Sequence, residues 1–143
     1  MELTEEQRQQ KVQEIKEEHS SEELLSLALH AIDDKQGLET ACFFIADIST
    51  VADYTIVSTA TSSTHLRVIA DTVRRAMKKK KYEQLNVGQQ DDDVWTILDF
   101  GTTIVHIMTA TSREHYNLEK MWAEGKVVNI EEMMASNPCD LSS

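Results

Sequence analysis

The chain has 143 residues, and its 25 acidic against 14 basic side chains give a formal net charge of −11. Nucleic acid repels so acidic a protein at long range, which disfavours direct or sequence-specific RNA or DNA binding and favours a basic protein partner. The chain has two cysteines, which lack the spacing of metal ligands, and this excludes a disulfide scaffold and indicates a reducing compartment such as the cytoplasm. No apolar run approaches the roughly 20 residues of a membrane span, which excludes a membrane protein.

Residues 1–19 are predicted to form an acidic N-terminal arm. Among many charges the segment offers only Leu3, Val12 and Ile15 as apolar residues. That is too little apolar surface to dock firmly on a folded body. The sequence therefore predicts a frayed helix or a disordered arm.

The first firm helix is predicted to begin at Ser20, where Ser20 and Glu23 form a capping-box pattern. Apolar residues then repeat at helical spacing as far as a stop signal at 35–37. These residues are Leu25, Leu29 and Ile32.

Two strands and a second helix are predicted next. Residues 41–48 form a continuous apolar strand that is closed by Asp47, and residues 53–59 form a second strand. Cap residues at 61–63 then start a helix that ends in the lysines at 78–81, where cations suit the negative end of the helix dipole. Its apolar stripe should bury against the sheet and consists of Leu66, Ile69, Ala70, Val73 and Met77.

Residues 94–107 are predicted to form a hairpin. Both faces of its first strand are largely apolar, which is typical of a sheet covered on both sides. Gly101 can adopt positive φ and Asp99 can accept hydrogen bonds from the turn, so the Asp-Phe-Gly tripeptide needs no metal. A third helix over 113–123 and a short strand over 126–130 follow.

The predicted order of elements is α-β-β-α-β-β-α-β. We expect an α/β (α+β) fold, with one domain over residues 20–130 and a C-terminal tail over 131–143. Two hairpin links and two helical crossovers, each expected to join parallel strands, predict a mixed sheet of about five strands flanked by helices.

The sequence contains no pattern for catalysis, metal binding or cofactor binding. Its five histidines are scattered, and no glycine-rich loop or nucleophile elbow is present. His106 lies on an apolar strand face, which favours a hydrogen-bonded structural histidine over a general base. We therefore predict a protein that is not an enzyme.

Aromatic residues are the strongest candidates for a binding surface, because Trp, Tyr and Arg dominate interface energetics. Trp95 lies beside a loop, across the strand from the expected buried face, and is the best of them.

Four motifs keep their order over residues 22–123 and together resemble the ribosomal silencing factor, or Iojap-like, family. They are Ala52-Asp53-Tyr54, Trp95 to Gly101, Val105-His106, and Arg113 to Glu119 with Trp122. The resemblance implies a nucleotidyltransferase-like mixed sheet without catalytic acids, and a homodimer when free. It also implies binding to ribosomal protein fourteen of the large subunit, which blocks subunit joining and lowers translation when nutrients are scarce.

We hypothesise one docking surface that combines the hairpin with neighbouring motif residues. Its members are Trp95, Leu98, Asp99 and Phe100, with Asp53, Tyr54, Arg113 and Tyr116 beside them. Two alternatives stay open. The first is a metal-dependent nucleotidyltransferase that uses Asp47, Asp53 and Asp99, and the second is an RNA-binding module that uses the lysines at 78–81.

Overall fold

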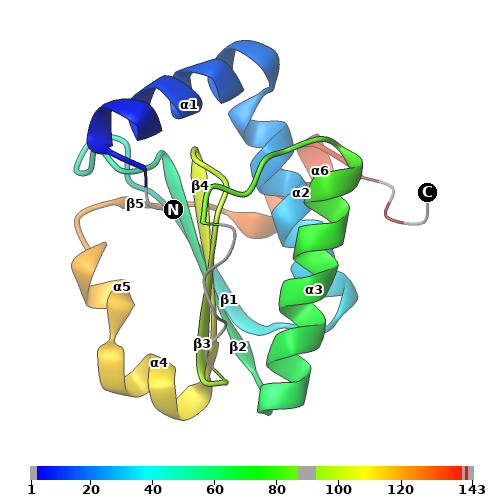
Figure 1. Cartoon of the computed structure of the whole chain (residues 1–143). Helices are drawn as coiled ribbons and strands as arrows, with labels where there is room; N and C mark the ends of the chain where they lie inside the picture. Colours follow the sequence, from blue (N-terminus) through cyan, green and yellow to red (C-terminus); the bar gives the residue numbers. More distant parts are fainter. Residues whose placement is uncertain (1–2, 87–92, 140, 142–143) are drawn as a thin grey trace.

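A computed structural model describes residues 3–86, 93–139 and 141, and its five strands form one mixed sheet (Figure 1). The strand order across the sheet is β3-β4-β2-β1-β5. The pair β2–β4 is parallel and the other three pairs are antiparallel. The strands are β1 Leu38–Phe44, β2 Tyr54–Ala60, β3 Trp95–Asp99, β4 Thr103–Thr109 and β5 Lys126–Val127. The predicted mixed five-stranded sheet is confirmed.

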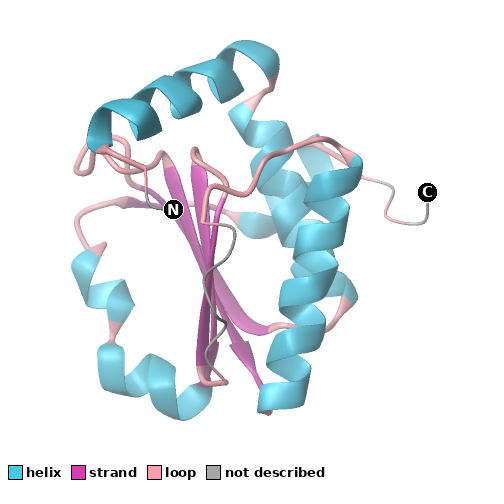
Figure 2. Ribbon diagram, in the orientation of Figure 1, coloured by secondary structure: helices cyan, strands magenta, loops and turns pink. Residues whose placement is uncertain are grey.

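Helices lie on both faces of the sheet and across one of its ends (Figure 2). The long helices α2 and α3 cover one face, the short helices α4 and α5 lie on the other, and α1 crosses the end. The helices are α1 Glu5–Glu18, α2 Ser21–Asp34, α3 Ser63–Lys79, α4 Ala110–Tyr116, α5 Leu118–Met121 and α6 Ile130–Ser136. No described helix is both long enough and apolar enough to span a membrane.

The central strand β2 is buried along its whole length because both of its faces are covered. Ile56 packs into the large cluster formed with α2 and α3, whereas its neighbour Val57 packs into a smaller cluster with Met108 and Leu118 on the opposite face. Successive strand side chains point to opposite faces, so one apolar run supplies both layers.

The predicted hairpin over residues 94–107 is confirmed. β3 and β4 pair from Trp95 opposite Met108 to Asp99 opposite Ile104. Gly101 has φ of +86°, and its N–H donates to Asp99 Oδ1 at 2.9 Å. The Asp-Phe-Gly tripeptide therefore serves the turn, as its residue types indicate.

The direction of one crossover was predicted wrongly. β3 is antiparallel to β4, and β4 is parallel to β2, so α3 connects two strands of opposite direction. Fifteen residues separate α3 from β3. Such a link can reach roughly 50 Å when extended, about twice the length of a seventeen-residue helix, so the chain can return to the end where α3 began. The second crossover does join strands of one direction, β4 and β5.

Several boundaries differ from the expected ones because of local backbone geometry. The predicted helix over 113–123 is divided into α4 and α5 at Asn117, which has φ of +45°. The last strand is two residues long. Asn129 then caps α6 by accepting a hydrogen bond from the N–H of Glu132, so part of the predicted tail is helical.

The N-terminal segment contains the helix α1, and a helix is one of the two forms expected for it. Thr4 and Gln7 form a reciprocal capping box at the start of α1. Ile15 is buried against the hairpin turn, where a Cβ on Gly101 would lie 2.8 Å from Ile15 Cδ1. Ion pairs supply further contacts that apolar periodicity does not reveal.

Candidate functional site

Five rings form a continuous row of contacts on the face that carries α4 and α5, and we name them the aromatic face. Its members are Phe43, Trp95, His106, Tyr116 and Trp122. The ring centroids of Tyr116 and Trp95 lie 4.8 Å apart, those of Trp95 and His106 5.9 Å, and those of His106 and Trp122 5.3 Å. Trp122 and Phe43 complete the row at 6.0 Å. These separations are typical of aromatic pairs.

Strand pairing explains why these rings meet. Trp95 and Ile97 point to one face of β3, and opposite them on β4 lie Met108 and His106. The smaller core cluster of Val57, Met108 and Leu118 lies with Trp95 and Trp122 against it. The aromatic face therefore packs on a thin apolar layer.

His106 fixes the position of Trp95. The indole Nε1–H of Trp95 donates to Nδ1 of His106 at 3.1 Å, and His106 is 7 % exposed. Burial lowers the pKa of His106 from 6.5 to about 4, so the ring is neutral at pH 7 and can accept this bond. The prediction of a hydrogen-bonded histidine is confirmed.

Part of the aromatic face is open to solvent. Tyr116 is 51 % exposed, and Met121, which precedes Trp122, is 70 % exposed. Val127 pairs with Phe43 across β1 and β5 and is 78 % exposed. Exposed apolar side chains that adjoin a row of rings mark a surface that another molecule can cover.

Arg113 braces the two short helices instead of pointing to solvent. Its Nη1 donates to the carbonyl of Glu39 at 2.6 Å and to Thr59 Oγ1 at 2.9 Å, while its Nε donates to Glu119 Oε1 at 2.8 Å. The hydrogen bond from Arg113 is the main cause that lowers the pKa of Glu119. Arg113 thereby ties α4 and α5 to β1 and β2, across the break at Asn117.

Three other predicted site residues belong to the core. Leu98 is 0 % exposed and Phe100 1 %, and both pack in the cluster beneath α2 and α3. Tyr54 is 8 % exposed, and its ring lies 5.3 Å from that of Phe44. These side chains hold the shape of the hairpin and its neighbouring loop.

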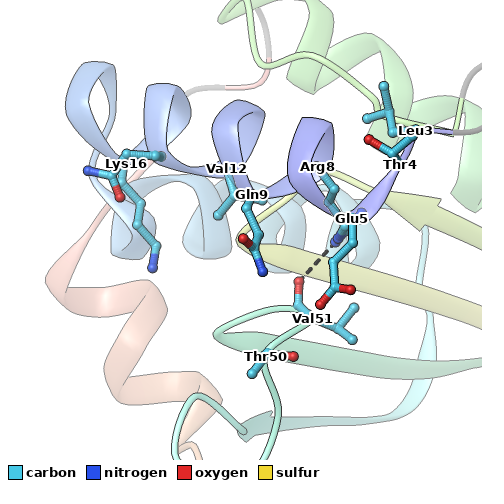
Figure 3. Close-up of a pocket in the computed structure, with 10 residues that line it drawn as sticks. Leu3, Thr4, Glu5, Arg8, Gln9, Val12, Lys16, Thr50 and Val51 are labelled. Atoms are coloured by element: carbon cyan, nitrogen blue, oxygen red, sulfur yellow. Dashed lines mark hydrogen bonds between the residues drawn. The ribbon is translucent and has the colours of Figure 1, made fainter.

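The two predicted carboxylates, Asp53 and Asp99, lie together at the end of the sheet under α1, and we name them the acidic edge. Both terminal nitrogens of Arg8 contact the Asp99 carboxylate, with Nη2 donating to Oδ1 at 3.0 Å. The same Nη2 donates to the carbonyl of Val51 at 3.0 Å (Figure 3). Lys16 Nζ lies 3.4 Å from the carboxylate of Asp53. Thus the eight predicted residues do not form one surface. Trp95 and Tyr116 lie in the aromatic face, Arg113 links α4 and α5 to the sheet, and Asp53 and Asp99 lie in the acidic edge. The other three, Leu98, Phe100 and Tyr54, lie in the core.

The carboxylates of the nucleotidyltransferase alternative do not converge on one point. Asp53 and Asp99 pair with cations of α1, and Asp47 lies 3.9 Å from Lys126. Among the residues that the structure describes, no group of three His, Cys, Asp or Glu side chains could hold a metal ion. The lysines at 78–81 of the RNA-binding alternative are exposed at the end of α3, the helix on the other face of the sheet.

Sequence reasoning missed some members of these sites. Phe43, His106 and Trp122 were not included in the predicted surface, although alternation along β3 and β4 could have placed His106 on the face of Trp95. Arg8 and Lys16 had no sequence signal, because their partners are 91 and 37 residues away.

Comparison with known proteins gives one consistent result. The model of a family described as "Ribosomal silencing factor during starvation" matches residues 17–141. A relative named ribosomal silencing factor RsfS in Haemophilus influenzae is 32 % identical over 100 residues, covering 70 % of this chain and 98 % of the relative. A relative of the same name in Halalkalibacterium halodurans is 29 % identical over 112 residues, covering 78 % and 96 %.

The crystal structure of a Chromobacterium violaceum protein resembles this fold with a TM-score of 0.70 at 22 % identity, covering 73 % of this chain and 88 % of the other. The match to the family model begins at residue 17, so most of α1 lies before it.

Proposed function

The chain belongs to the ribosomal silencing factor family, whose members bind the ribosome and are not enzymes, and from this premise we propose that it binds the large ribosomal subunit and blocks joining of the small subunit. Ribosomal protein fourteen is the proposed contact, and the proposed effect is lower translation when nutrients are scarce. We place this action in the cytoplasm. Blocking by occupancy needs no reaction, only a complex that persists.

The observation that carries the proposal is the aromatic face. It combines large rings with exposed apolar side chains at Tyr116, Met121 and Val127. Interface cores are enriched in Trp, Tyr and Met, and a specific interface buries about 1,600 Å² in total. The net charge of −11 favours encounter with a basic ribosomal protein.

We assign different roles to the predicted site residues. Trp95 and Tyr116 contact the partner through the aromatic face, and His106 and Arg113 hold those contacts in position. The acidic edge adds charge complementarity. Leu98, Phe100 and Tyr54 are buried, so their role is to hold the hairpin and the neighbouring loop in shape.

We also propose that two copies of the free chain pair through the aromatic face. Its ring Tyr116 is more than half exposed in one copy, and so are two neighbours of its members: Met121, which precedes Trp122, and Val127, which pairs with Phe43. A symmetric dimer would cover the same patch on both copies. Binding to the ribosome would then compete with pairing.

The test is co-sedimentation with separated large subunits in a sucrose gradient, followed by a subunit-joining assay. Tyr116→Ala should weaken binding by about tenfold or more, because it removes the exposed ring at one end of the row while leaving the core intact. Val68→Ala is the matched control, since Val68 is 41 % exposed but lies on α3 over the opposite face.

Two results would refute the proposal. Undiminished co-sedimentation of Tyr116→Ala would remove the aromatic face from the interface. Normal assembly of the two subunits in a saturating amount of the protein would remove the function itself. Binding to naked RNA that falls steeply with salt would instead support the RNA-binding alternative.

A further inference from the structure

Four oxygen atoms surround the guanidinium group of Arg8. The two carboxylate oxygens of Asp99 face its two terminal nitrogens, and the carbonyls of Val51 and Gly101 lie 3.0 and 3.4 Å from Nη2. A guanidinium is planar and presents its donors as a fork, so a carboxylate flanked by carbonyls matches arginine better than lysine. Asp99 is 16 % exposed in its side chain and Arg8 is 20 % exposed.

The acceptors are held by the body of the protein and not by α1. Asp99 Oδ1 also accepts the N–H of Gly101 at 2.9 Å, which fixes the carboxylate on the turn. The N–H groups of Asp53 and Tyr54 both donate to the carbonyl of Thr102 at 3.0 Å, which ties the β1–β2 loop to the same turn. Asp99 and the β1–β2 loop are therefore held by hydrogen bonds that do not involve Arg8.

The attachment of α1 is mostly polar. Within α1, all of which is described, Ile15 is the one buried residue. The ion pairs of Lys11 with Glu83 and of Lys16 with Asp53 are partly or largely exposed. Exposed ion pairs contribute little and are screened by salt. Release of α1 would thus uncover the acidic edge and would remove one side chain, Ile15, from the large core cluster.

We propose that Asp99, with the carbonyls of Val51 and Gly101, forms an arginine-binding site that Arg8 fills within the chain and that an arginine of a basic protein partner fills after α1 leaves. The acceptors lie within the residues matched by the family, whereas Arg8 precedes them. The partner half of the proposal rests on the proposed function. Under it, α1 competes with the large subunit for the acidic edge, and Lys16 covers Asp53 in the same way.

Variants at each partner of the Arg8–Asp99 ion pair can distinguish exchange with a partner arginine from a contact that only stabilises the fold. Arg8→Gln removes the competitor and leaves the acceptors, so binding to large subunits should tighten about threefold or more. Asp99→Asn removes the acceptor charge but keeps an oxygen for the N–H of Gly101, so binding should weaken by about tenfold. A contact that only stabilises the fold predicts the same direction for both variants.

The matched control is Lys11→Gln. It changes the net charge by the same amount as Arg8→Gln, and it breaks an ion pair of α1 that does not involve the acidic edge. Its affinity should equal that of the unaltered chain. Tightening by Lys11→Gln as large as that by Arg8→Gln would mean that the gain in affinity does not depend on emptying the Asp99 site, and would overturn the exchange at that site.

A second measurement tests the site without ribosomes. Arg8→Ala leaves a vacancy, and millimolar methylguanidinium should raise its thermal midpoint, whereas methylammonium should not. The double variant Arg8→Ala with Asp99→Asn controls for general effects of the ion and should gain nothing. Equal behaviour of the single and double variants would overturn the arginine site.

The subunit-binding experiment and the methylguanidinium experiment test different parts of the proposal. If no variant binds large subunits, the proposed function is wrong, and the methylguanidinium result still decides whether the site exists. If methylguanidinium acts as expected but Arg8→Gln and Asp99→Asn change affinity in one direction, the exchange with a partner is wrong.

Discussion

Lowering the pH should weaken the fold through His106. Its pKa falls from 6.5 in an exposed setting to about 4 in the fold, because it is buried. Between these values the unfolded chain binds a proton that the folded chain does not, so stability is present above pH 6.5 and is lost as the pH falls toward 4. Two-state linkage with these pKa values gives a loss of about 2 kcal/mol between pH 7 and pH 5.

Urea unfolding at several pH values measures this loss. Carboxylates also change stability with pH, so the informative quantity is the difference between the unaltered chain and His106→Gln. Glutamine does not titrate, and its side-chain oxygen can accept the indole N–H of Trp95. His106→Gln should lose about 2 kcal/mol less than the unaltered chain between pH 7 and pH 5.

Parallel pH profiles for the two chains would refute this account of His106. The same conclusion would follow from a nuclear magnetic resonance titration in which the ring of His106 protonates near pH 6.5. Either result would mean that the ring is open to water, and that the hydrogen bond with Trp95 at 3.1 Å does not persist in solution.

Three further predictions concern stability and reactivity. Leu98→Ala should lower the free energy of unfolding by about 2–5 kcal/mol, because Leu98 is fully buried, whereas Ile97→Ala, at a position 39 % exposed, should cost less, both measured in urea. Gly101→Ala should cost about 1–3 kcal/mol, because alanine resists φ of +86° and its Cβ would press on α1, and hydrogen exchange in α1 should rise. Cys42 is buried with its thiol pKa raised to about 12, so at pH 8 an alkylating reagent should label Cys139 in the folded chain and Cys42 only after unfolding.

Specific results would contradict each of these. Equal losses for Leu98→Ala and Ile97→Ala would mean that the two faces of β3 are equally buried. Unchanged exchange in α1 for Gly101→Ala would mean that α1 does not rest on the turn. Rapid labelling of Cys42 in the folded chain would mean that β1 opens readily.

Local sequence patterns predicted most of the helices, strands and turns, because helix caps and turns are determined by residues that are close in sequence. Ser20 starts α2 as its capping pattern indicates, and Gly101 forms the turn. The direction of β3 was wrong because a fifteen-residue link permits either direction. The break at Asn117 was missed because a left-handed residue leaves no mark in apolar spacing.

The candidate site was predicted less well, because residue type alone does not reveal which face of a strand is covered. The chemistry of Trp95 indicates an interface residue, and its ring lies in the aromatic face. Leu98 and Phe100 share the same hairpin but point beneath α2 and α3. Arg113 has the chemistry of an interface residue, yet backbone and side-chain acceptors from distant segments hold it in place.

Alternate residues of β3 face opposite sides of the sheet. Odd positions carry Trp95, Ile97 and Asp99, while the even positions Thr96 and Leu98 are buried beneath. A substitution at Ile97, which is 39 % exposed, therefore changes the outer side of β3, whereas one at Leu98 changes the interior beneath α2 and α3. A one-residue insertion in β3 would exchange the outer and inner side chains all at once, because strand side chains alternate between the two faces.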